Sequence, residues 1–306
     1  MSTQLFPSEA DDERHRMAEW AEAASLDEMI AWSRNLLRDV QDEVRRSHAL
    51  TATLGLFSGG NDSTTFMHLL RSEFDSAVHV NTGIGVAETR QYVRDCCTAW
   101  DLPLIVERPP PGASYRDLVL AYGFPGPASH RLMYSMLKER ALREVRRQHV
   151  SDHRAERVLF VAGMRYFESD RRSRNTEATH RDGSVVWCSP LIWWTGRHMA
   201  EYRERFEVPR NEVSDNLHMS GECLCGAMAD QGEDREERAA IRFFYPEFDR
   251  RLCQIENECR NRGLPYTEWG VKRDPKAVAA DREAAGMLCQ SCAYRQPSLD
   301  FGGQQS

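Results

Sequence analysis

The sequence predicts an α/β protein: a doubly wound, mostly parallel sheet, preceded by N-terminal helices and followed by a small helical, cysteine-bearing C-terminal lobe. Short apolar runs alternate with amphipathic segments between residues 51 and 192, which indicates strands that alternate with helices and a sheet covered on both faces. Beyond residue 193 the pattern changes to helices and cysteine-bearing loops. We therefore divide the chain into 1–50, a helical segment; 51–192, the α/β domain; and 193–306, the C-terminal lobe.

The composition is that of a globular protein, with 306 residues, 41% hydrophobic and 28% charged residues, and a net charge of -7. No run of about 18 apolar residues occurs, and the N-terminus is acidic and polar, unlike a signal peptide. We expect a cytoplasmic protein with no membrane partner. In a reducing compartment, nine cysteines indicate free thiols together with a metal or cluster site, and not a disulfide framework.

The first helix signal is a capping box, in which Ser25 is followed three residues later by Glu28 and then by apolar residues at helical spacing. The α/β domain starts with an apolar run at 53–57, a turn and an amphipathic segment, which together predict one strand-helix unit. In order, the expected elements are strand 53–57, helix 64–70, strand 77–80, helix 87–100, strand 104–106, helix 130–149, strand 157–162, helix 195–206 and two helices within 233–262.

The turn after the first strand, residues 58–63 (SGGNDS), is the strongest candidate site. Its two glycines allow a sharp turn that brings backbone amides to an anion, and the following helix adds partial positive charge. The serine hydroxyls can donate to phosphate oxygens, and Asp62 is placed to cap the helix or to hold Mg²⁺. A plain Gly-Gly turn is the competing interpretation. A Walker-type kinase is disfavoured because its lysine motif is absent.

Three motifs in order resemble the PP-loop superfamily, an adenine nucleotide alpha hydrolase-like fold, and within it the phosphoadenosine phosphosulfate reductase branch. SGGNDS is similar to the SGGxDS signature, and VHVNTGIGVAET at 78–89 is similar to a D-T-G-like loop followed by an E-T pair. A G-x-R-x-x-E-S-x-R-R element is matched by Gly163, Arg165, Glu168, Ser169, Arg171 and Arg172. The resemblance spans about 51–190.

This resemblance implies an ATP-like nucleotide and Mg²⁺ at the loop, and Asn61 stands where the family has a lysine. We expect Lys138 or Arg131 to supply the missing charge, and we take Asp62, Arg165 and Lys138 as the catalytic candidates. The residues implied to bind nucleotide are Ser58, Gly59, Gly60, Asn61, Asp62 and Ser63 in the loop, Thr82 and Gly83 beside it, and Arg165, Arg171 and Arg172 at the phosphate or transferred group.

Four cysteines form a possible metal set, Cys223 and Cys225 in a C-x-C loop and Cys289 and Cys292 in a C-x-x-C pair. Four thiolates fit tetrahedral zinc or an iron-sulfur cluster. Scattered free cysteines are the alternative interpretation.

The other cysteines suggest different roles. Cys253 and Cys259 lie six positions apart on one expected helix, about 120° apart around its axis, so they are poorly placed to share a metal. Cys96 and Cys97 are adjacent and are expected to be buried as small apolar residues. Cys188, at a strand end, is either buried or a carrier of a persulfide.

Departures from the reductase pattern decide the functional hypothesis. Sulfonucleotide reductases are expected to carry a C-terminal cysteine in an E-C-G-like segment, and this chain ends SLDFGGQQS; where iron-sulfur reductases have a Cys-Cys pair, it has HRLMY at 130–134. It therefore looks more like the sulfur-inserting component of DNA phosphorothioation systems. That resemblance implies an ATP pyrophosphatase with an iron-sulfur cluster, expected to be 4Fe-4S with zinc as the alternative, and a cysteine desulfurase or other sulfur donor.

The net charge bears on the DNA partner, because an acidic protein does not hold a polyanion over its whole surface. We expect DNA to be held through partner proteins, or locally by the basic stretch 131–174, which is otherwise a solvated helix face. Two alternatives remain: a sulfonucleotide reductase that uses another thiol, and a non-catalytic nucleotide-sensing module with structural zinc.

Overall fold

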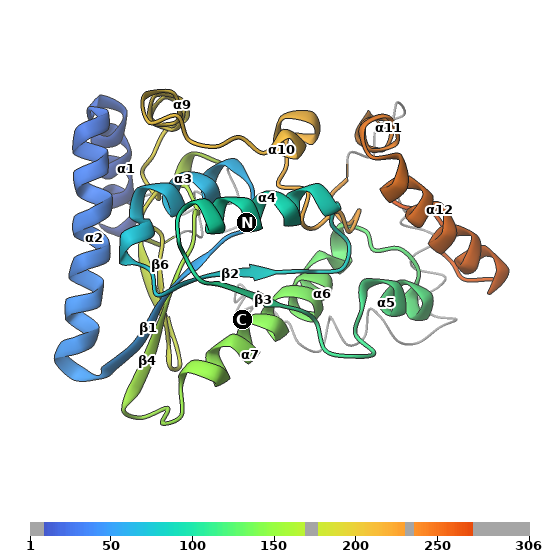
Figure 1. Cartoon of the computed structure of the whole chain (residues 1–306), viewed down its shortest axis with the longest axis horizontal. Helices are drawn as coiled ribbons and strands as arrows, with labels where there is room; N and C mark the ends of the chain where they lie inside the picture. The colour runs from blue at the N-terminus through green and yellow to red at the C-terminus, as the bar shows by residue number, and fades with distance from the viewer. Residues whose placement is uncertain (1–8, 169–176, 230–235, 272–306) are drawn as a thin grey trace, which may run out of the picture. The chain divides into compact units, whose positions relative to one another are not determined.

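The computed structural model describes residues 9–168, 177–229 and 236–271 (Figure 1). The chain groups into two compact units. Unit 1 comprises Met1–Asn81, Ala87–Glu107 and Leu142–Glu222, and unit 2 comprises Thr82–Val86, Arg108–Ala141 and Cys223–Ser306.

Within the described residues, unit 1 is built on a six-stranded sheet in the order β3-β2-β1-β4-β6-β5. All neighbouring strands run parallel except β5, which is antiparallel to β6. The strands are β1 (Ala49–Leu56), β2 (Ser76–Val80), β3 (Leu104–Glu107), β4 (Glu156–Val161), β5 (Thr179–Asp182) and β6 (Val185–Cys188).

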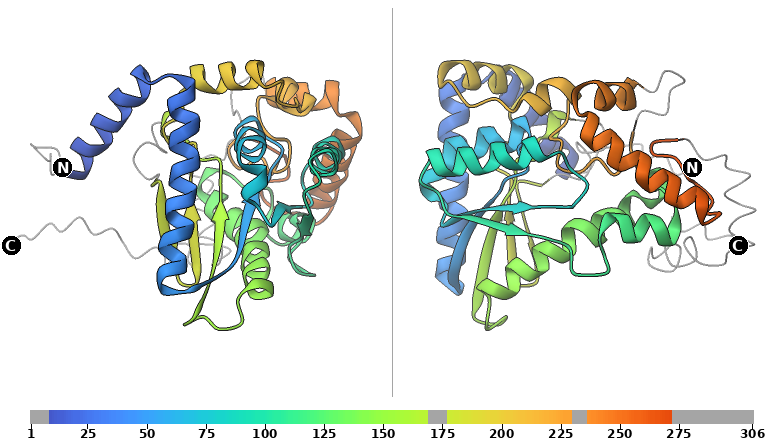
Figure 2. Two further views of the ribbon diagram at one scale, coloured as in Figure 1. Left: turned by 60° about the vertical axis from the view of Figure 1, so that its left-hand side comes forward. Right: turned by 45° about the vertical axis from the view of Figure 1, so that its right-hand side comes forward.

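Helices cover both faces of this sheet, as a doubly wound fold requires (Figures 1 and 2). Leu159 and Val161 of β4 join the core beneath α2 (Leu26–Ser47), α3 (Asn61–Leu70), α4 (Ala87–Ala99) and α9 (Gly196–Arg205). Val158 and Phe160 face the other way, toward α7 (Arg140–His149). The alternation follows from the two-residue period of a strand, and the predicted α/β class is confirmed.

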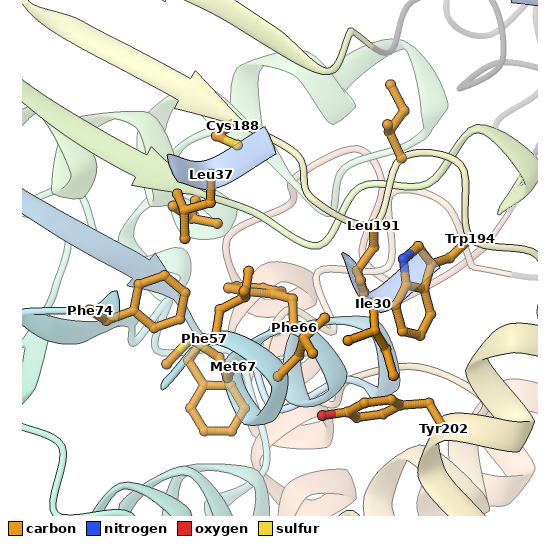
Figure 3. Packing of buried hydrophobic residues seen from close by; sticks show 14 of the residues in the cluster. Ile30, Leu37, Phe57, Phe66, Met67, Phe74, Cys188, Leu191, Trp194 and Tyr202 are labelled. Atoms are coloured by element: carbon orange, nitrogen blue, oxygen red, sulfur yellow. The ribbon is translucent and has the colours of Figure 1, made fainter. Parts of the chain in front are cut away.

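The core beneath α2 and α3 is dominated by large side chains that are almost wholly buried, including Phe57, Phe66 and Trp194 (Figure 3). Burying each such side chain contributes about 1.5–3 kcal/mol. The buried Ser33 of α2 donates to the Pro190 carbonyl at 2.6 Å and accepts from Trp194 Nε1 at 2.8 Å. This pair of bonds ties α2 to the segment after β6.

The N-terminal helices are α1 (Glu9–Ala23) and α2, and the predicted capping box of α2 is confirmed: Ser25 accepts from the Glu28 amide while Glu28 accepts from the Ser25 amide. Two other predictions need correction. The expected helix 130–149 is divided into α6 (His130–Tyr134), a π-helical turn (η3, Ser135–Glu139) and α7. The polar strand β5 is absent from the sequence prediction, because its four residues are exposed and show no apolar alternation.

Unit 2 contains α5 (Tyr115–Tyr122), α6, η3, α11 (Glu236–Phe244) and α12 (Pro246–Asn261). The remaining elements are the short η1 (Arg71–Glu73), η2 (Pro127–Ser129) and η4 (Tyr166–Glu168), together with α10 (Glu212–Leu217). The contacts place α9 and α10 in unit 1. The sequence analysis assigned these residues to the C-terminal lobe, 193–306. Across the part of the chain that the structure describes, every helix is too short or too polar to cross a membrane.

Candidate phosphate site and cysteine loop

The loop 58–63, hereafter the phosphate loop, lies at the point where the strand order reverses. β1 has β2 on one side and β4 on the other, so the carboxyl ends of β1 and β4 flank a topological switch point. Ligands of open α/β sheets bind at this position. The phosphate loop follows β1 and the Gly163 segment follows β4, so the sheet brings two of the three sequence motifs to one edge.

Two glycines shape the phosphate loop. Gly59 has a φ of 80°, which is the left-handed region that favours glycine, and a Cβ there would lie 2.8 Å from Cγ2 of Thr89. Gly60 is the N-cap of α3 and makes no side-chain capping bond. The helix thus begins at Asn61, three residues before its predicted start, and its first turn points unsatisfied amides toward the switch point.

The hydroxyls of the loop hold its backbone in shape. Ser63 Oγ and Thr64 Oγ1 each donate to the Gly60 carbonyl at 2.9 Å, and Ser58 Oγ lies 3.1 Å from Ser63 Oγ. A hydroxyl rotates easily, so the Ser58 and Ser63 groups can exchange these contacts for a phosphate oxygen.

Residues that the sequence analysis did not identify hold the phosphate loop in place from behind through hydrogen bonds and packing. Asn211 Nδ2 donates to the Gly59 carbonyl at 2.8 Å, while Asn211 Oδ1 accepts from the Val213 amide and caps α10. Thr89 Oγ1 donates to the Ser220 carbonyl at 2.8 Å. The E-T pair of the second motif therefore has a structural role in its threonine. The only sequence signal for Asn211 is that asparagine is a favoured N-cap residue, and no helix was expected at 212–217.

Asp62 does not cap α3, which corrects one of its two predicted roles. Its Oδ2 accepts from Arg165 Nε at 2.8 Å, and Arg165 also donates to the Trp194 carbonyl at 3.3 Å. Gly163 allows this approach, because a Cβ there would lie 3.0 Å from the Asp62 backbone. The third motif thus delivers its arginine to the first turn of the helix that follows the phosphate loop.

The second sequence motif divides between the units at its centre. Asn81 belongs to unit 1, and its amide donates to the Glu107 carbonyl at 2.8 Å. Thr82 and Gly83 belong to unit 2, where the buried Thr82 accepts from the Ile84 amide and the Gly83 carbonyl accepts from Arg251 at 2.9 Å.

Residues 220–222 pack in unit 1 against the phosphate loop. A Cβ on Gly60 would lie 3.1 Å from Ser220 Cβ, and Glu222 Oε2 lies 3.0 Å from His79 Nε2 with both side chains 2% exposed. His79 Nδ1 lies 2.8 Å from the Phe57 carbonyl and carries a hydrogen, because a carbonyl only accepts. The pair therefore fixes the start of the cysteine motif to the end of β2.

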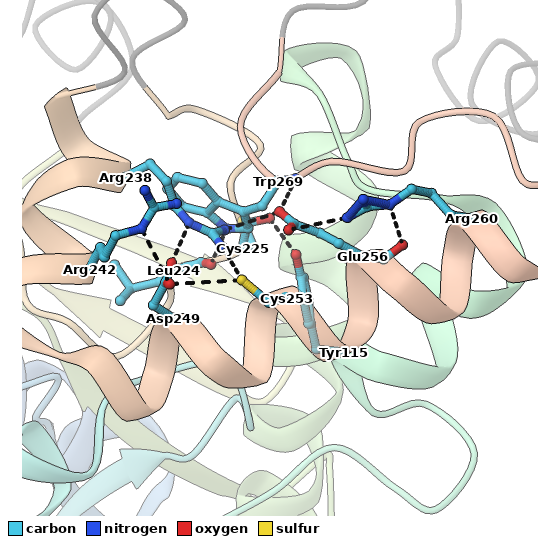
Figure 4. Close-up of polar contacts among 10 residues, drawn as sticks. All are labelled: Tyr115, Leu224, Cys225, Arg238, Arg242, Asp249, Cys253, Glu256, Arg260 and Trp269. Atoms are coloured by element: carbon cyan, nitrogen blue, oxygen red, sulfur yellow. Dashed lines mark hydrogen bonds and ion pairs between the residues drawn. The ribbon is translucent and has the colours of Figure 1, made fainter.

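The cysteine loop itself, residues 223–226, is held within unit 2 by buried aromatic donors (Figure 4). Tyr115 donates its hydroxyl to the Cys225 carbonyl at 2.7 Å, and Trp269 Nε1 donates to the Leu224 carbonyl at 2.8 Å. Gly226 has a φ of 78°, and a Cβ there would lie 2.7 Å from Trp269 Nε1. The loop conformation is therefore set by packing.

Below the loop, a buried guanidinium supports Trp269. Arg238 donates to Asp249 at 2.7 Å and to Glu256 at 3.2 Å, and its Cζ lies 5.7 Å from the centroid of the Trp269 ring (Figure 4). Glu256 also accepts from the Trp269 amide at 3.1 Å. This network orders the tryptophan that holds the cysteine loop.

The two thiols of the loop interact, which fits them to share a metal. A hydrogen bond with Cys223 and burial raise the pKa of Cys225, while the positive charge of Lys138 opposes the shift. A bound cation removes both thiol protons, so a thiol pair that shares a proton at close range is a suitable half of a four-thiolate site. The other half, Cys289 and Cys292, lies outside the described residues. Among the described residues, groups of three or more His, Cys, Asp or Glu suited to a metal do not occur.

The thiols of Cys96, Cys97 and Cys188 are buried. Burial raises the pKa of Cys96 to about 11 and those of Cys97 and Cys188 to about 12. The predicted burial of Cys96 and Cys97 is confirmed. Cys188 is fully buried in the core (Figure 3), which favours its apolar role over that of a persulfide carrier.

Cys253 and Cys259 face different surroundings on α12, as their spacing predicts. Cys253 contacts Arg238 and Asp249, whereas Cys259 lies near the Val119 carbonyl.

The other predicted site residues are distributed as follows. Lys138, in the π-helical turn, and Arg131, whose Nη2 lies 3.5 Å from Glu139, belong to unit 2, whereas the phosphate loop belongs to unit 1. Arg171 and Arg172 lie outside the described residues. In the basic stretch, Arg143 and Arg147 are exposed, while Arg157 is buried and donates to backbone carbonyls near β4.

The fold and the site together define a doubly wound α/β protein with a glycine-rich loop at its switch point. The model of the phosphoadenosine phosphosulfate reductase domain matches residues 53–220, which is more than half of the chain. The chain belongs to this family, within the PP-loop superfamily. No curated protein sequence matches the chain significantly.

Solved structures show a similar chain path at low sequence identity. Phosphoadenylyl-sulfate reductase from Candida auris, in a phosphate complex, is 13% identical, with a TM-score of 0.43, over 70% of this chain and 94% of that chain. FMN adenylyltransferase from Candida glabrata, with FAD and pyrophosphate, is 10% identical with a TM-score of 0.43, over 67% and 70%. A U34-tRNA thiolase from Methanococcus maripaludis, with its [4Fe-4S] cluster, is 12% identical with a TM-score of 0.37, over 84% and 90%.

Proposed function

We propose that this protein is an ATP pyrophosphatase that activates a phosphate oxygen so that sulfur can replace it, with the DNA backbone as the acceptor. The observation that carries the proposal is the packing of residues 220–222 against the phosphate loop. Cys223 follows Ser220 by three residues, and three residues of extended chain span at most about 11 Å. The covalent chain therefore limits how far Cys223 can lie from Ser220.

In this proposal the phosphate loop and the first-turn amides of α3 bind the β- and γ-phosphates of ATP. Asp62 would hold Mg²⁺, and Arg165 would contact the α-phosphate. An acceptor phosphate oxygen attacks the α-phosphorus, the bond to the β-phosphate oxygen breaks, and pyrophosphate leaves. A sulfur nucleophile supplied by a cysteine desulfurase or another donor then attacks the acceptor phosphorus, and AMP leaves with the oxygen.

The cysteine set Cys223, Cys225, Cys289 and Cys292 would hold an iron-sulfur cluster, with zinc as the alternative. When bound, such a cluster supplies a place to bind or pass on sulfur. The chain's own contribution is to fix the loop backbone through Tyr115 and Trp269.

The test is product analysis on anaerobically purified protein incubated with ATP and Mg²⁺, with and without DNA and a desulfurase. We expect AMP and pyrophosphate in equal amounts, and DNA phosphorothioate when acceptor and donor are both present. Formation of ADP alone, or intact ATP under every condition, contradicts the proposal, and intact bound ATP would identify a nucleotide-sensing module instead.

The family match favours one second candidate, a sulfonucleotide reductase. A reductase consumes phosphoadenosine phosphosulfate and releases sulfite when thioredoxin is supplied as reductant. Sulfite release in that assay, with no AMP or pyrophosphate formed from ATP, would support the reductase and contradict the proposed pyrophosphatase.

A further inference from the structure

The phosphate loop has Asn61 at the position where the resembled signature carries a lysine, so its positive charge must come from another residue. Within unit 1 a guanidinium lies beside this residue. Arg203 of α9 donates from Nη1 to the Asn61 carbonyl at 3.4 Å and from Nη2 to the Pro209 carbonyl at 3.4 Å. Both bonds are long, and they occupy two of the five N–H groups of the side chain.

The charge of Arg203 has no dedicated counter-ion. Among the described residues, no carboxylate lies within 4.0 Å of its guanidinium. The two acidic groups that influence it, Asp62 and Asp215, are each engaged by another arginine: Asp62 by Arg165 at 2.8 Å and Asp215 by Arg210 at 3.1 Å. Arg203 is half-buried, and burial lowers its pKa. A partly desolvated cation bonded only to carbonyls gains from an anion that binds beside it.

Neighbouring packing restricts where this guanidinium can move. α9 packs on α3, and Tyr92 Oη lies 3.0 Å from the same Pro209 carbonyl oxygen and 3.2 Å from Thr64 Oγ1. The tyrosine thus links the Arg203 bond partner to the helix of the phosphate loop.

We propose that Arg203 is a phosphate-binding residue that replaces the missing lysine of the phosphate loop and neutralises the β- and γ-phosphates of the bound nucleotide. The inference rests on the phosphate loop of the proposed function, but it concerns binding and not the fate of the nucleotide. It also distinguishes Arg203, which bonds only to carbonyls, from Arg165, which Asp62 holds at 2.8 Å.

The experiment compares the dissociation constants of Mg·ATP, pyrophosphate and adenosine by calorimetry for wild type, Arg203→Gln, Arg203→Lys, and Arg203→Gln combined with Asn61→Lys. Losing one charge-assisted contact weakens binding by about tenfold or more. We expect that loss for ATP and pyrophosphate in Arg203→Gln, with adenosine unchanged, a smaller loss in Arg203→Lys, and recovery when Asn61→Lys is added. Arg205→Gln, an exposed residue of the same helix that pairs with Asp27, is the matched control.

Unchanged ATP affinity in Arg203→Gln overturns the inference, even if the protein makes AMP. A parallel loss of ATP and adenosine binding, with a lower Tm and no recovery by Asn61→Lys, also overturns it, because that pattern marks a packing role. Tight ATP binding that Arg203→Gln abolishes, without any AMP formed, sustains the inference and contradicts the proposed function.

Discussion

Arg165 Nε lies 2.8 Å from Asp62 Oδ2, which joins the segment after β4 to the first turn of α3. The two side chains are 14% and 22% exposed, so the pair is accessible to a ligand at the switch point. Asp62 is the carboxylate that the Mg²⁺ of a nucleotide complex can reach, and Arg165 is the cation that such a complex would release.

Asp62→Asn removes the carboxylate charge and keeps the shape of the side chain. A lost electrostatic contact to reacting groups costs about 10²–10³ in rate, whereas a partly exposed ion pair contributes about 0–1 kcal/mol to stability. We expect a loss of AMP formation of that size with Tm nearly unchanged, measured at saturating and at limiting Mg²⁺. Asp27→Asn, which removes the exposed partner of Arg205, is the control; equal losses in both variants would contradict the role of Asp62.

Gly59→Ala tests the backbone of the phosphate loop. An alanine at a φ of 80° costs about 1–2 kcal/mol, and its Cβ would in addition lie 2.8 Å from Thr89. Gly112→Ala has a φ of 76° with no atom within 4 Å, so it carries the strain without the contact. We expect ATP affinity to fall in Gly59→Ala and to hold in Gly112→Ala, with the larger loss of unfolding free energy in the former. Equal ATP affinity in the two variants would show that the loop shape does not matter for binding.

Glu222→Ala leaves His79 buried without its carboxylate. Removing one partner of a buried ion pair costs about 3–5 kcal/mol, and we expect unfolding free energy to fall by that order in chemical denaturation. Glu73→Ala, at an exposed acidic residue of η1, should change it by less than about 0.5 kcal/mol. A Glu222→Ala protein as stable as Glu73→Ala would mean that the contact at 3.0 Å does not anchor the cysteine motif.

Serine substitutions separate the metal cysteines from the buried ones. Cys223→Ser and Cys225→Ser should lose bound iron and acid-labile sulfide, or zinc if zinc is the metal, as should Cys289→Ser and Cys292→Ser. Cys96→Ser should keep the metal, because that thiol lies on the buried face of α4 and burial raises its pKa to about 11. Metal content measured on folded protein shows which cysteines bind the metal. Retention of metal in Cys223→Ser would exclude Cys223 from the ligands.

His68 should make stability depend on pH. Burial, with a smaller effect of Arg71, lowers the pKa of His68 from 6.5 to about 4, so between these values the unfolded chain binds a proton that the folded protein does not. Its contribution is therefore present above pH 6.5 and is lost as pH falls toward 4. We expect the unfolding free energy of wild type to decline more steeply from pH 7 to 5 than that of His68→Gln. His15→Gln, at an exposed histidine, should keep the wild-type slope.

Local patterns in the sequence determined much of this protein. Short apolar runs predicted strands β1 to β4, because buried parallel strands appear in a sequence as short apolar runs bounded by turns. The Ser25 capping box predicted the start of α2. The glycines at 59 and 60 predicted a phosphate loop because their backbone requirement is local. Polar β5 showed no such pattern, and the start of α3 was missed because Gly60 caps it without a side chain.

Only the tertiary structure decided which residues support the phosphate loop. Asn211, Ser220 and Arg203 lie more than a hundred residues along the chain from it, and their contacts depend on how α9 and α10 return to the sheet. The sequence determined that a phosphate loop and a cysteine motif exist, since each is encoded within a few consecutive residues. The tertiary structure decided that residues 220–222 join them and that Arg203 lies beside Asn61, because packing between distant segments sets those contacts.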